Sequence, residues 1–421
     1  MTTPKVHRLA NGATLVCDPV AGFETLALSV VAGRGARSED ASRSGWSHLL
    51  EHMVFKGAGA RSALDIVEAI EAEGGQINAA TGQERTSFQV RALAGGLPLA
   101  LAVTADLIQR PTLDADDLAK EVHVVGQEIA EAADTPDDQV FELAHGAAFA
   151  GQPLGRPILG SVETIGRSDP ATLEAWRAGL YAPDRLVISA SGAVDEDEFA
   201  RLAEDAFGAA IGEGSPTPAA AHFTGGTVRE RRKLEQAHLV LLLPAPGILD
   251  EDHWALRLFA EMLGGGMSSR LFQEARERLG LAYAIDAWAD AYADVGVLGI
   301  YAGCAAADAG RLAETAAGEI LSLATEAKNG ELDRAKVQFK ASLFMGRESL
   351  AARAEQAAAQ VLAFGRLLPP AEMAAAIDAV MPEDIARVAG RVLGPRLCTV
   401  SALGPKAAMD APARFEARLF G

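Results

Sequence analysis

Several residue types and segments are scarce in this chain, and their scarcity limits the classes to which it can belong. The three cysteines, Cys17, Cys304 and Cys398, stand far apart in 421 residues and in apolar surroundings. They are too few and too scattered for a disulfide framework or a thiolate metal site, so we expect buried free thiols. No run reaches the roughly 18 apolar residues that a membrane-spanning helix needs, so we expect no membrane span.

We expect no targeting segment at the start of this sequence. The first residues, MTTPKVHRLANGATLV, contain no charged stretch followed by an apolar one, and they are not rich in Arg and Ser. Neither a secretory signal nor a transit peptide is therefore predicted. We expect a cytoplasmic location, with a periplasmic one as the less favoured alternative.

Basic residues are outnumbered by acidic ones. The chain has 38 Lys and Arg against 57 Asp and Glu, which gives a formal net charge of −19. Such a charge repels phosphates, so nucleic acid is not an expected partner. The negative charge is compatible with cationic peptides as ligands, and solubility alone explains it equally well.

Length and composition predict a folded chain with more than one domain. With 421 residues and 49% hydrophobic content, the chain is too long for one ordinary core. The stretch AIGEGSPTPAAAHFTGGT is small, contains Pro and Gly, and lacks periodicity, which is typical of a linker. We therefore predict an N-terminal domain of residues 1–212, a linker of residues 213–227 and a C-terminal domain of residues 228–421.

The two predicted domains repeat one order of elements. Alternating strands precede a helix; a second helix, a glycine break and an extended segment follow. Long Ala-rich helices come next, including residues 113–133 and 308–328, and a helix and a strand end each half. This order indicates duplication of one α/β unit. The predicted fold class is α+β: two homologous α/β domains, each a mostly antiparallel sheet with helices packed on it.

Two of only eight histidines stand four residues apart in the segment SHLLEHMVFKG. A helix advances about 100° per residue, so His48, Glu51 and His52 fall within one polar stripe. The His-x-x-Glu-His pattern is the inverted form of the zinc-peptidase helix signature. Two imidazoles one turn apart can bind one metal ion, and the glutamate can act as general base toward a water at that metal. The alternative is a helix surface that carries two unrelated histidines.

A third protein ligand must come from elsewhere, and the spacing of the motif does not identify it. The helical segment DADDLAKEVHVVGQEIAEAA offers candidates. Glu121 and Glu128 are seven residues apart, two helical turns, and therefore share a face, whereas His123 points well away from Glu128. The alternative for either glutamate is an ordinary solvated helix face.

Together these motifs resemble the pitrilysin, or inverzincin, family of zinc metallopeptidases, specifically the branch of mitochondrial processing peptidase and its bacterial relatives. That branch has a glutamate about 76 residues beyond the second histidine of its motif, and Glu128 stands at that distance from His52. The segments HMVFKGAGARS, PLGRPILGSVETI and GGGMSSRLFQEARERLGLAY are also similar to the family. The resemblance covers almost the whole chain.

The resemblance implies a role for each residue of the motif. His48, His52 and Glu128 would bind one Zn²⁺ per active site. Glu51 would be the general base, and Glu121 would support the site by orienting the groups that bind the metal.

Three further residues would bind the substrate, according to the same resemblance. Asn78 lies in a strand that would pair, at the edge of a sheet, with an extended peptide. Arg276 and Tyr283 would grip the substrate and stabilise the tetrahedral oxyanion. The alternatives are an ordinary edge strand, an arginine paired with Glu274 or Glu277, and a tyrosine in the core.

The predicted function is that of a zinc-dependent endopeptidase that hydrolyses extended peptides or presequence-like segments in an enclosed chamber. The alternative is a non-catalytic core or scaffold subunit of a processing-peptidase-like complex. The second half has no His-x-x-Glu-His motif, and the chain resembles one half of the family's clamshell. We therefore expect a dimer, formed either with another copy or with a paralogous subunit.

Overall fold

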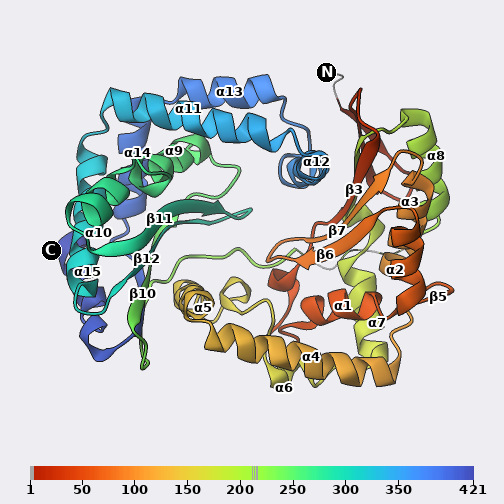
Figure 1. Ribbon diagram of the computed structural model, residues 1–421, viewed down its shortest axis with the longest axis horizontal. Helices are drawn as coiled ribbons and strands as arrows, with labels where there is room; N and C mark the ends of the chain where they lie inside the picture. The colour runs from red at the N-terminus through yellow and green to blue at the C-terminus, as the bar shows by residue number, and fades with distance from the viewer. Residues whose placement is uncertain (1–3, 211, 213, 215–216) are drawn as a thin grey trace. The chain divides into compact units, whose positions relative to one another are not determined.

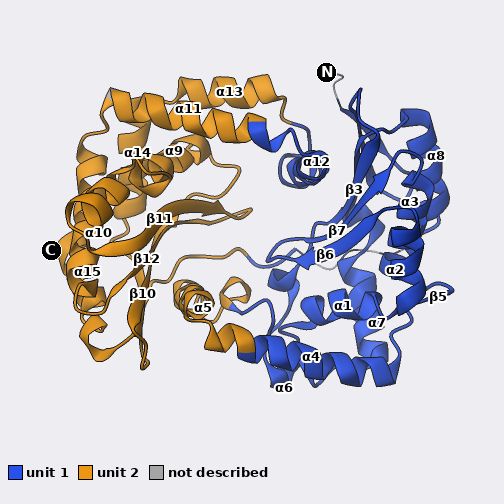
Figure 2. Cartoon of the chain, in the orientation of Figure 1, with its two compact units in different colours: residues 1–130, 156–219, 345–367 blue, residues 131–155, 220–344, 368–421 orange. Residues whose placement is uncertain are grey.

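The structure is a computed structural model, and it describes residues 4–210, 212, 214 and 217–421 (Figure 1). Its residues form two compact units, each with its own sheet (Figure 2). Unit 1 comprises residues 1–130, 156–219 and 345–367. Unit 2 comprises residues 131–155, 220–344 and 368–421.

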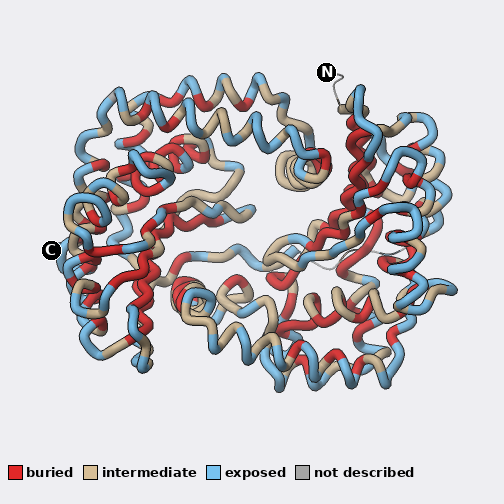
Figure 3. The backbone as a smooth tube through the Cα atoms, in the orientation of Figure 1, coloured by how far each residue is buried: buried red, intermediate tan, exposed pale blue. Residues whose placement is uncertain are grey.

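Unit 1 is built on a six-stranded sheet. Its strands, in spatial order, are β1 (Lys5–Arg8), β2 (Thr14–Pro19), β8 (Leu186–Gly192), β3 (Thr25–Ala32), β7 (Thr86–Leu93) and β6 (Gln76–Thr81). Only β2 and β8 pair in parallel; the other neighbours are antiparallel. Strands β3 and β8 are apolar and buried nearly throughout, whereas β6 alternates between exposed and half-buried residues at the edge (Figure 3).

Helices cover both faces of this sheet. Side chains alternate between the two faces along each strand, and in β3 the side chains on both faces are buried. Leu28 and Val30 of β3 face the main core, while Ala27 and Val31 pack toward α12 (Leu350–Phe364). The other helices of this unit are α1 (Trp46–Val54), α2 (Ala63–Ala72), α3 (Leu97–Gln109), most of α4 (Ala115–Asp134), α6 (Val162–Ile165), α7 (Pro170–Leu180) and α8 (Glu196–Phe207). A two-stranded hairpin, β4 (Gly57–Ala58) and β5 (Arg61–Ser62), follows α1.

Unit 2 is built on a five-stranded sheet. The strands, in spatial order, are β11 (Ala282–Ala291), β12 (Gly296–Ala305), β10 (Gln236–Ala245), β13 (Thr399–Gly404) and β9 (Gly226–Arg231). Its helices are α5 (Pro136–Ala148), α9 (His253–Gly264), α10 (Ala309–Thr325), most of α11 (Asn329–Gly346), α13 (Pro370–Ala379), α14 (Pro382–Leu393) and α15 (Ala411–Phe420), with a π-helix at Phe272–Arg278.

Apart from β1, which has no counterpart in unit 2, the two sheets have the same topology. In unit 2 only β13 and β9 pair in parallel, as only β8 and β2 do in unit 1. The order β2-β8-β3-β7-β6 therefore matches β9-β13-β10-β12-β11, strand for strand and direction for direction. The predicted fold class is confirmed: two α/β domains of one fold, each with a mostly antiparallel sheet.

The compact units are not the contiguous halves of the sequence. Helix α5 precedes the predicted linker but packs on β10 and β13 of unit 2, and α12 follows the linker but packs on β3 and β8 of unit 1. Each half of the sequence thus contributes one helix to the unit that is built mainly from the other half. The predicted boundaries at 212 and 228 stay a prediction about the repeat; part of the linker, residues 213 and 215–216, lies outside the described residues.

The start of helix α4, the cysteines and the apolarity of the helices are also predicted from the sequence. The helix predicted from residue 113 begins at Ala115, because Leu113 has a φ of 47° and lies outside helical geometry. All three cysteines are free, with Cys17 and Cys304 buried and Cys398 half-buried. Within the described residues, no helix is both long and apolar enough to cross a membrane.

Candidate metal centre

Helix α1 carries the His-x-x-Glu-His motif, and a buried carboxylate caps its start. Gly45, with a φ of 92°, precedes the helix in a conformation that suits glycine. The carboxylate of Glu39 accepts hydrogen bonds from the backbone N–H groups of Gly45 (2.8 Å) and Ser47 (2.7 Å). Burial raises the pKa of Glu39 to about 7, against the opposing effect of these hydrogen bonds. The first turn of α1 is thereby held to the preceding loop.

Two histidines of α1 and one glutamate of α4 converge. The Oε2 atom of Glu128 lies 3.8 Å from Nε2 of His48 and 3.5 Å from Nε2 of His52. The two imidazole centroids are 4.7 Å apart. The apolar residues of α1 are buried on the opposite side, as the periodicity predicts. In the part of the chain that the structure describes, this is the one group of His, Cys, Asp and Glu whose geometry could hold a metal ion.

His48 is held in its neutral form. Burial, followed by the neighbouring His52, lowers the pKa of His48 to about 4. Its Nδ1 atom is buried and has no hydrogen-bond partner among the described residues. A neutral imidazole keeps a nitrogen lone pair available for a metal ion.

His52 is oriented by a carboxylate on α4. Its Nδ1 atom lies 3.1 Å from Oε2 of Glu121, whose other oxygen lies 2.7 Å from Nζ of Lys56. Glu121 is buried, with 5% of its surface exposed, so the lysine supplies the counter-charge that a buried carboxylate needs. A carboxylate at Nδ1 fixes the tautomer that leaves Nε2 free on the side of Glu128. Sequence reasoning missed Lys56, although its position four residues after His52 is a detectable signal.

Glu51 lies beside the two histidines without belonging to the converging group. Burial raises its pKa, and hydrogen bonding by the hydroxyl and backbone N–H of Thr81 acts in the opposite direction. Its Oε2 atom is buried and has no partner within the described residues. Thr81, at the end of β6, was also missed, because only the packing of α1 against β6 brings it to Glu51.

The three converging groups fit zinc. Zinc binds imidazole nitrogen and carboxylate oxygen in a tetrahedral arrangement, and ligand atoms about 2.1 Å from the ion are then about 3.4 Å from one another. The separations from Glu128 to the two histidines, 3.8 and 3.5 Å, are close to that value. His123, by contrast, lies outside the group: it is exposed and contacts Gln127.

Asn78 lies on β6, the edge strand of the unit 1 sheet. It is exposed and is opposite Gln89 of β7. Because no further strand of the sheet follows β6 in the described residues, its outer edge offers backbone groups to an added strand.

Arg276 and Tyr283 both lie in unit 2, in irregular backbone. Arg276 belongs to the π-helix, and its guanidinium lies 4.7 Å from the ring centroid of Phe272. Glu274 pairs with Arg278 instead. Tyr283 is the extra residue of a β-bulge in edge strand β11 and is 59% exposed, so it is not a core tyrosine. π-helical turns and bulges redirect side chains and are frequent at functional sites.

Comparison with known proteins identifies the family. The profile described as "Insulinase (Peptidase family M16)" matches residues 18–162, and "Peptidase M16 inactive domain" matches residues 169–339. An uncharacterized zinc protease of Rickettsia bellii is 34% identical over 95% of this chain and 97% of its own length. This chain belongs to peptidase family M16. An uncharacterized zinc protease of Bacillus subtilis, another relative, is 36% identical over 82% of this chain and 85% of its own length.

Solved structures support the fold of this M16 chain. A protease from Helicobacter pylori superimposes with a TM-score of 0.89 at 21% identity, covering 96% of this chain and 99% of its own. A peptidase M16 inactive domain from Pseudomonas fluorescens gives 0.87 at 20% identity, covering 96% and 98%. A chain of Complex III2 from Candida albicans gives 0.86 at 20% identity, covering 99% of both. At these identities the likeness concerns the fold alone.

Proposed function

We propose that the chain is a zinc-dependent endopeptidase. The observation that carries the proposal is the convergence of His48, His52 and Glu128 beside the carboxylate of Glu51. Two imidazoles and one carboxylate are a donor set that zinc binds in peptidases, with one position left for water. The names of the relatives, uncharacterized zinc proteases, support the same metal.

Each side chain of the centre has a task in peptide hydrolysis. Zinc, when bound, supplies a Lewis acid that polarises a carbonyl and makes a water molecule acidic near neutral pH. Glu51 accepts the proton of the attacking water and delivers it to the leaving amine. Glu121, with Lys56 as its counter-charge, accepts the Nδ1–H of His52 and keeps that ring in one orientation. His48 stays neutral at pH 7, because its pKa is about 4.

The proposed substrates are extended peptides or presequence-like segments, cut inside an enclosed chamber. The outer edge of β6, with Asn78, pairs with the substrate backbone, which selects extended segments largely without regard to side chains. Arg276 and Tyr283 donate hydrogen bonds to the substrate and to the oxyanion. In two-chain members of the resembled branch, these donors come from the other subunit. We therefore propose a dimer, with a second copy or with a paralogous subunit.

A non-catalytic core or scaffold subunit is the second candidate. The match to the "inactive domain" profile favours it. That match covers residues 169–339, however, and the metal centre lies before them. The presence of His48, Glu51, His52 and Glu128 together favours the peptidase, because a scaffold subunit has no need of ligands and base.

Metal analysis and peptide cleavage test the proposal together. The purified wild-type chain should contain about one zinc per site and should cleave an unstructured, dye-labelled peptide. Glu128→Gln should lose most of its zinc, whereas His123→Ala, on the same helix but away from the group, should keep it. If the purified wild-type chain contained no zinc and did not cleave the peptide after zinc was added, the scaffold role would be favoured. If zinc content followed His123, the proposed third ligand would be wrong.

A further inference from the structure

The hairpin β4–β5 ties the end of the two-histidine helix to the start of the two-glutamate helix. A two-residue turn separates helix α1 from Gly57. The carbonyl of Gly57 accepts hydrogen bonds from the Thr112 hydroxyl (2.7 Å) and backbone N–H (2.8 Å). The N–H of Gly59, at the tip of the hairpin, donates to the carbonyl of Arg110 (2.8 Å). Residues 110–112 lead into α4. The connection is therefore made just outside both helices that carry the metal centre.

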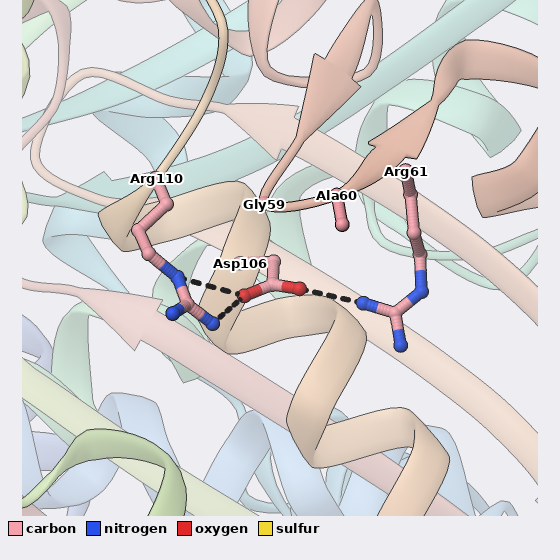
Figure 4. A pocket seen from close by; sticks show the side chains of 5 residues that line it. All are labelled: Gly59, Ala60, Arg61, Asp106 and Arg110. Carbon is pink, nitrogen blue, oxygen red and sulfur yellow. Dashed lines mark hydrogen bonds and ion pairs between the residues drawn. The ribbon is translucent and has the colours of Figure 1, made fainter.

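A buried carboxylate reinforces this contact. Asp106 of α3 lies between two guanidinium groups (Figure 4). Arg61 of the hairpin donates to one of its oxygens (2.5 Å), and Arg110 donates to the other through Nε (3.0 Å). A shallow pocket opens at these residues and at Gly59 and Ala60. Both arginines are directed at Asp106, which occupies the position that an anionic ligand would take. This cluster is therefore an anchor for the hairpin rather than a binding site.

The close approach depends on glycine. A Cβ atom on Gly57 would lie 2.4 Å from Oγ1 of Thr112, and one on Gly59 would lie 2.6 Å from Oδ2 of Asp106. Gly59 also has a φ of 61°, in the left-handed region that glycine adopts without strain. The hairpin is thus shaped to bring its backbone against residues 106–112.

Leu113, which follows Thr112, is held in a strained conformation. Its φ of 47° is unfavourable for a leucine, and its side chain is buried. Asp114 then caps α4 by accepting hydrogen bonds from the N–H groups of Asp116 and Asp117. Such strain persists only where the surroundings over-determine the backbone. The hydrogen bonds of Thr112 and the burial of the Leu113 side chain fix the backbone conformation of Leu113. That conformation in turn sets the direction in which α4 leaves.

Small changes in that direction have large effects at the metal centre. Glu128 lies 13 residues beyond the start of α4, which at 1.5 Å per residue is about 20 Å along the helix. A tilt of about 10° at Leu113 would therefore move Glu128 by about 3 Å, whereas metal ligands tolerate displacements of only about 0.2 Å. Apolar packing and the contacts of Glu121 with His52 and Lys56 limit tilting along α4, and the hydrogen bonds from Thr112 to Gly57 limit it at the start of the helix.

We propose that Thr112 is a positioning residue for the metal centre, acting through Gly57 to fix α4, and with it Glu128, relative to α1. The proposal rests on the proposed zinc site. Thr112 is distant in sequence from the two histidines and from Glu51, and its hydroxyl bonds to Gly57 rather than to a metal ligand or the base. The Asp106 cluster supports Thr112 by holding the hairpin in place.

The test compares Thr112→Val with a control of the same chemistry. Thr112→Val keeps the shape and the backbone N–H but removes the hydroxyl donor. Thr325→Val removes a hydroxyl that, like that of Thr112, belongs to an exposed threonine and donates to a backbone carbonyl, that of Leu321 within α10 (2.8 Å). Zinc affinity is measured by competition with a chelator, and the visible spectrum of the Co²⁺-loaded chain reports the coordination geometry. Thermal unfolding of each metal-free variant measures how much stability the loss of a hydroxyl costs by itself.

We expect Thr112→Val to weaken zinc binding roughly 10-fold, at the lower end of what supporting residues of metal sites contribute. Its Co²⁺ absorption should weaken or shift, and Thr112→Ser should restore both properties. Thr325→Val should lose similar stability but keep wild-type zinc affinity and spectrum. Equal zinc affinities in wild type and Thr112→Val, or equal losses in both valine variants, would overturn the positioning role. Failure of the wild-type chain to bind zinc would instead overturn the proposed function.

Discussion

Glu51 is the residue on which the proposed chemistry depends most. It lies beside the two histidines, with one carboxylate oxygen buried and without a partner among the described residues. We expect Glu51→Gln to keep its zinc and to cleave peptides at least about 100-fold more slowly, because an amide cannot accept the proton of water. Metal content and turnover measured on one preparation test this. Near-normal turnover with full zinc would exclude Glu51 as the base.

His253 gives unit 2 a pH dependence of its own. It is the first residue of α9 and is buried; burial, followed by Arg257, lowers its pKa from 6.5 to about 4. The unfolded chain therefore binds this proton more tightly, so the stability contributed above pH 6.5 is lost as the pH falls toward 4. The difference corresponds to up to about 3 kcal/mol.

The His253→Gln variant isolates this effect, because glutamine is uncharged at every pH. Denaturant unfolding of both proteins at several pH values between 4 and 7 is the measurement. The free energy of unfolding should fall more steeply toward low pH in the wild type than in the variant. Parallel curves would show that His253 is not held neutral by the fold.

At the scale of elements, a buried ion pair joins α12 to strand β2 of unit 1. Arg353 of α12 donates to both carboxylate oxygens of Asp18 in β2, at 2.7 and 2.8 Å, and the Ser191 hydroxyl donates to one of them. Both charged side chains are at most 5% exposed. Removing one partner of a buried pair leaves an uncompensated charge, which costs about 3–5 kcal/mol.

Arg353→Met should therefore destabilise unit 1 by an amount near that range. The double variant Arg353→Met with Asp18→Asn should recover a substantial part, because no buried charge is left. Arg201→Met, which removes an exposed pair with Asp205 on α8, serves as control and should cost under about 1 kcal/mol. Unfolding free energies of the four proteins form the comparison. A loss at Arg353 no greater than at Arg201 would mean that the ion pair does not hold α12.

At the scale of the whole molecule, the proposed dimer predicts complementation between two inactive chains. Glu51 belongs to unit 1, and Tyr283 belongs to unit 2. If the donors come from the other subunit, a mixed dimer of Glu51→Gln and Tyr283→Phe chains has one intact site and one site that lacks both groups. Random exchange makes roughly half the dimers mixed, so activity should approach about a quarter of wild type.

The complementation experiment needs a direct measure of subunit exchange, for example energy transfer between differently labelled chains. Exchange without recovery of activity would mean that each site is completed within one chain or by a different protein. The two variants alone, at the same total concentration, are the controls. Recovery must exceed the sum of their residual activities.

The sequence by itself determined the local features of this protein. The spacing of His48, Glu51 and His52 defines one face of a helix, and seven residues place Glu121 and Glu128 on one face of another, because helical geometry is periodic. Alternation along the strands and the repeated order of elements likewise predicted two similar α/β domains. The 76 residues between His52 and Glu128 identified a third ligand only through family resemblance, since nothing in that interval specifies where α4 packs.

Tertiary structure alone decided which elements meet. Ala-rich amphipathic helices such as α5 and α12 can cover any apolar sheet, so their pattern does not reveal that each packs on the sheet of the other half of the chain. Thr81, which bonds to Glu51, and Thr112, which bonds to Gly57, come from segments distant in sequence from their partners. Their short polar side chains give no periodic signal. The bulge at Tyr283 depends on its pairing with β12. Local patterns determine the face that an element presents, but the partner of that face is chosen by packing across the whole fold.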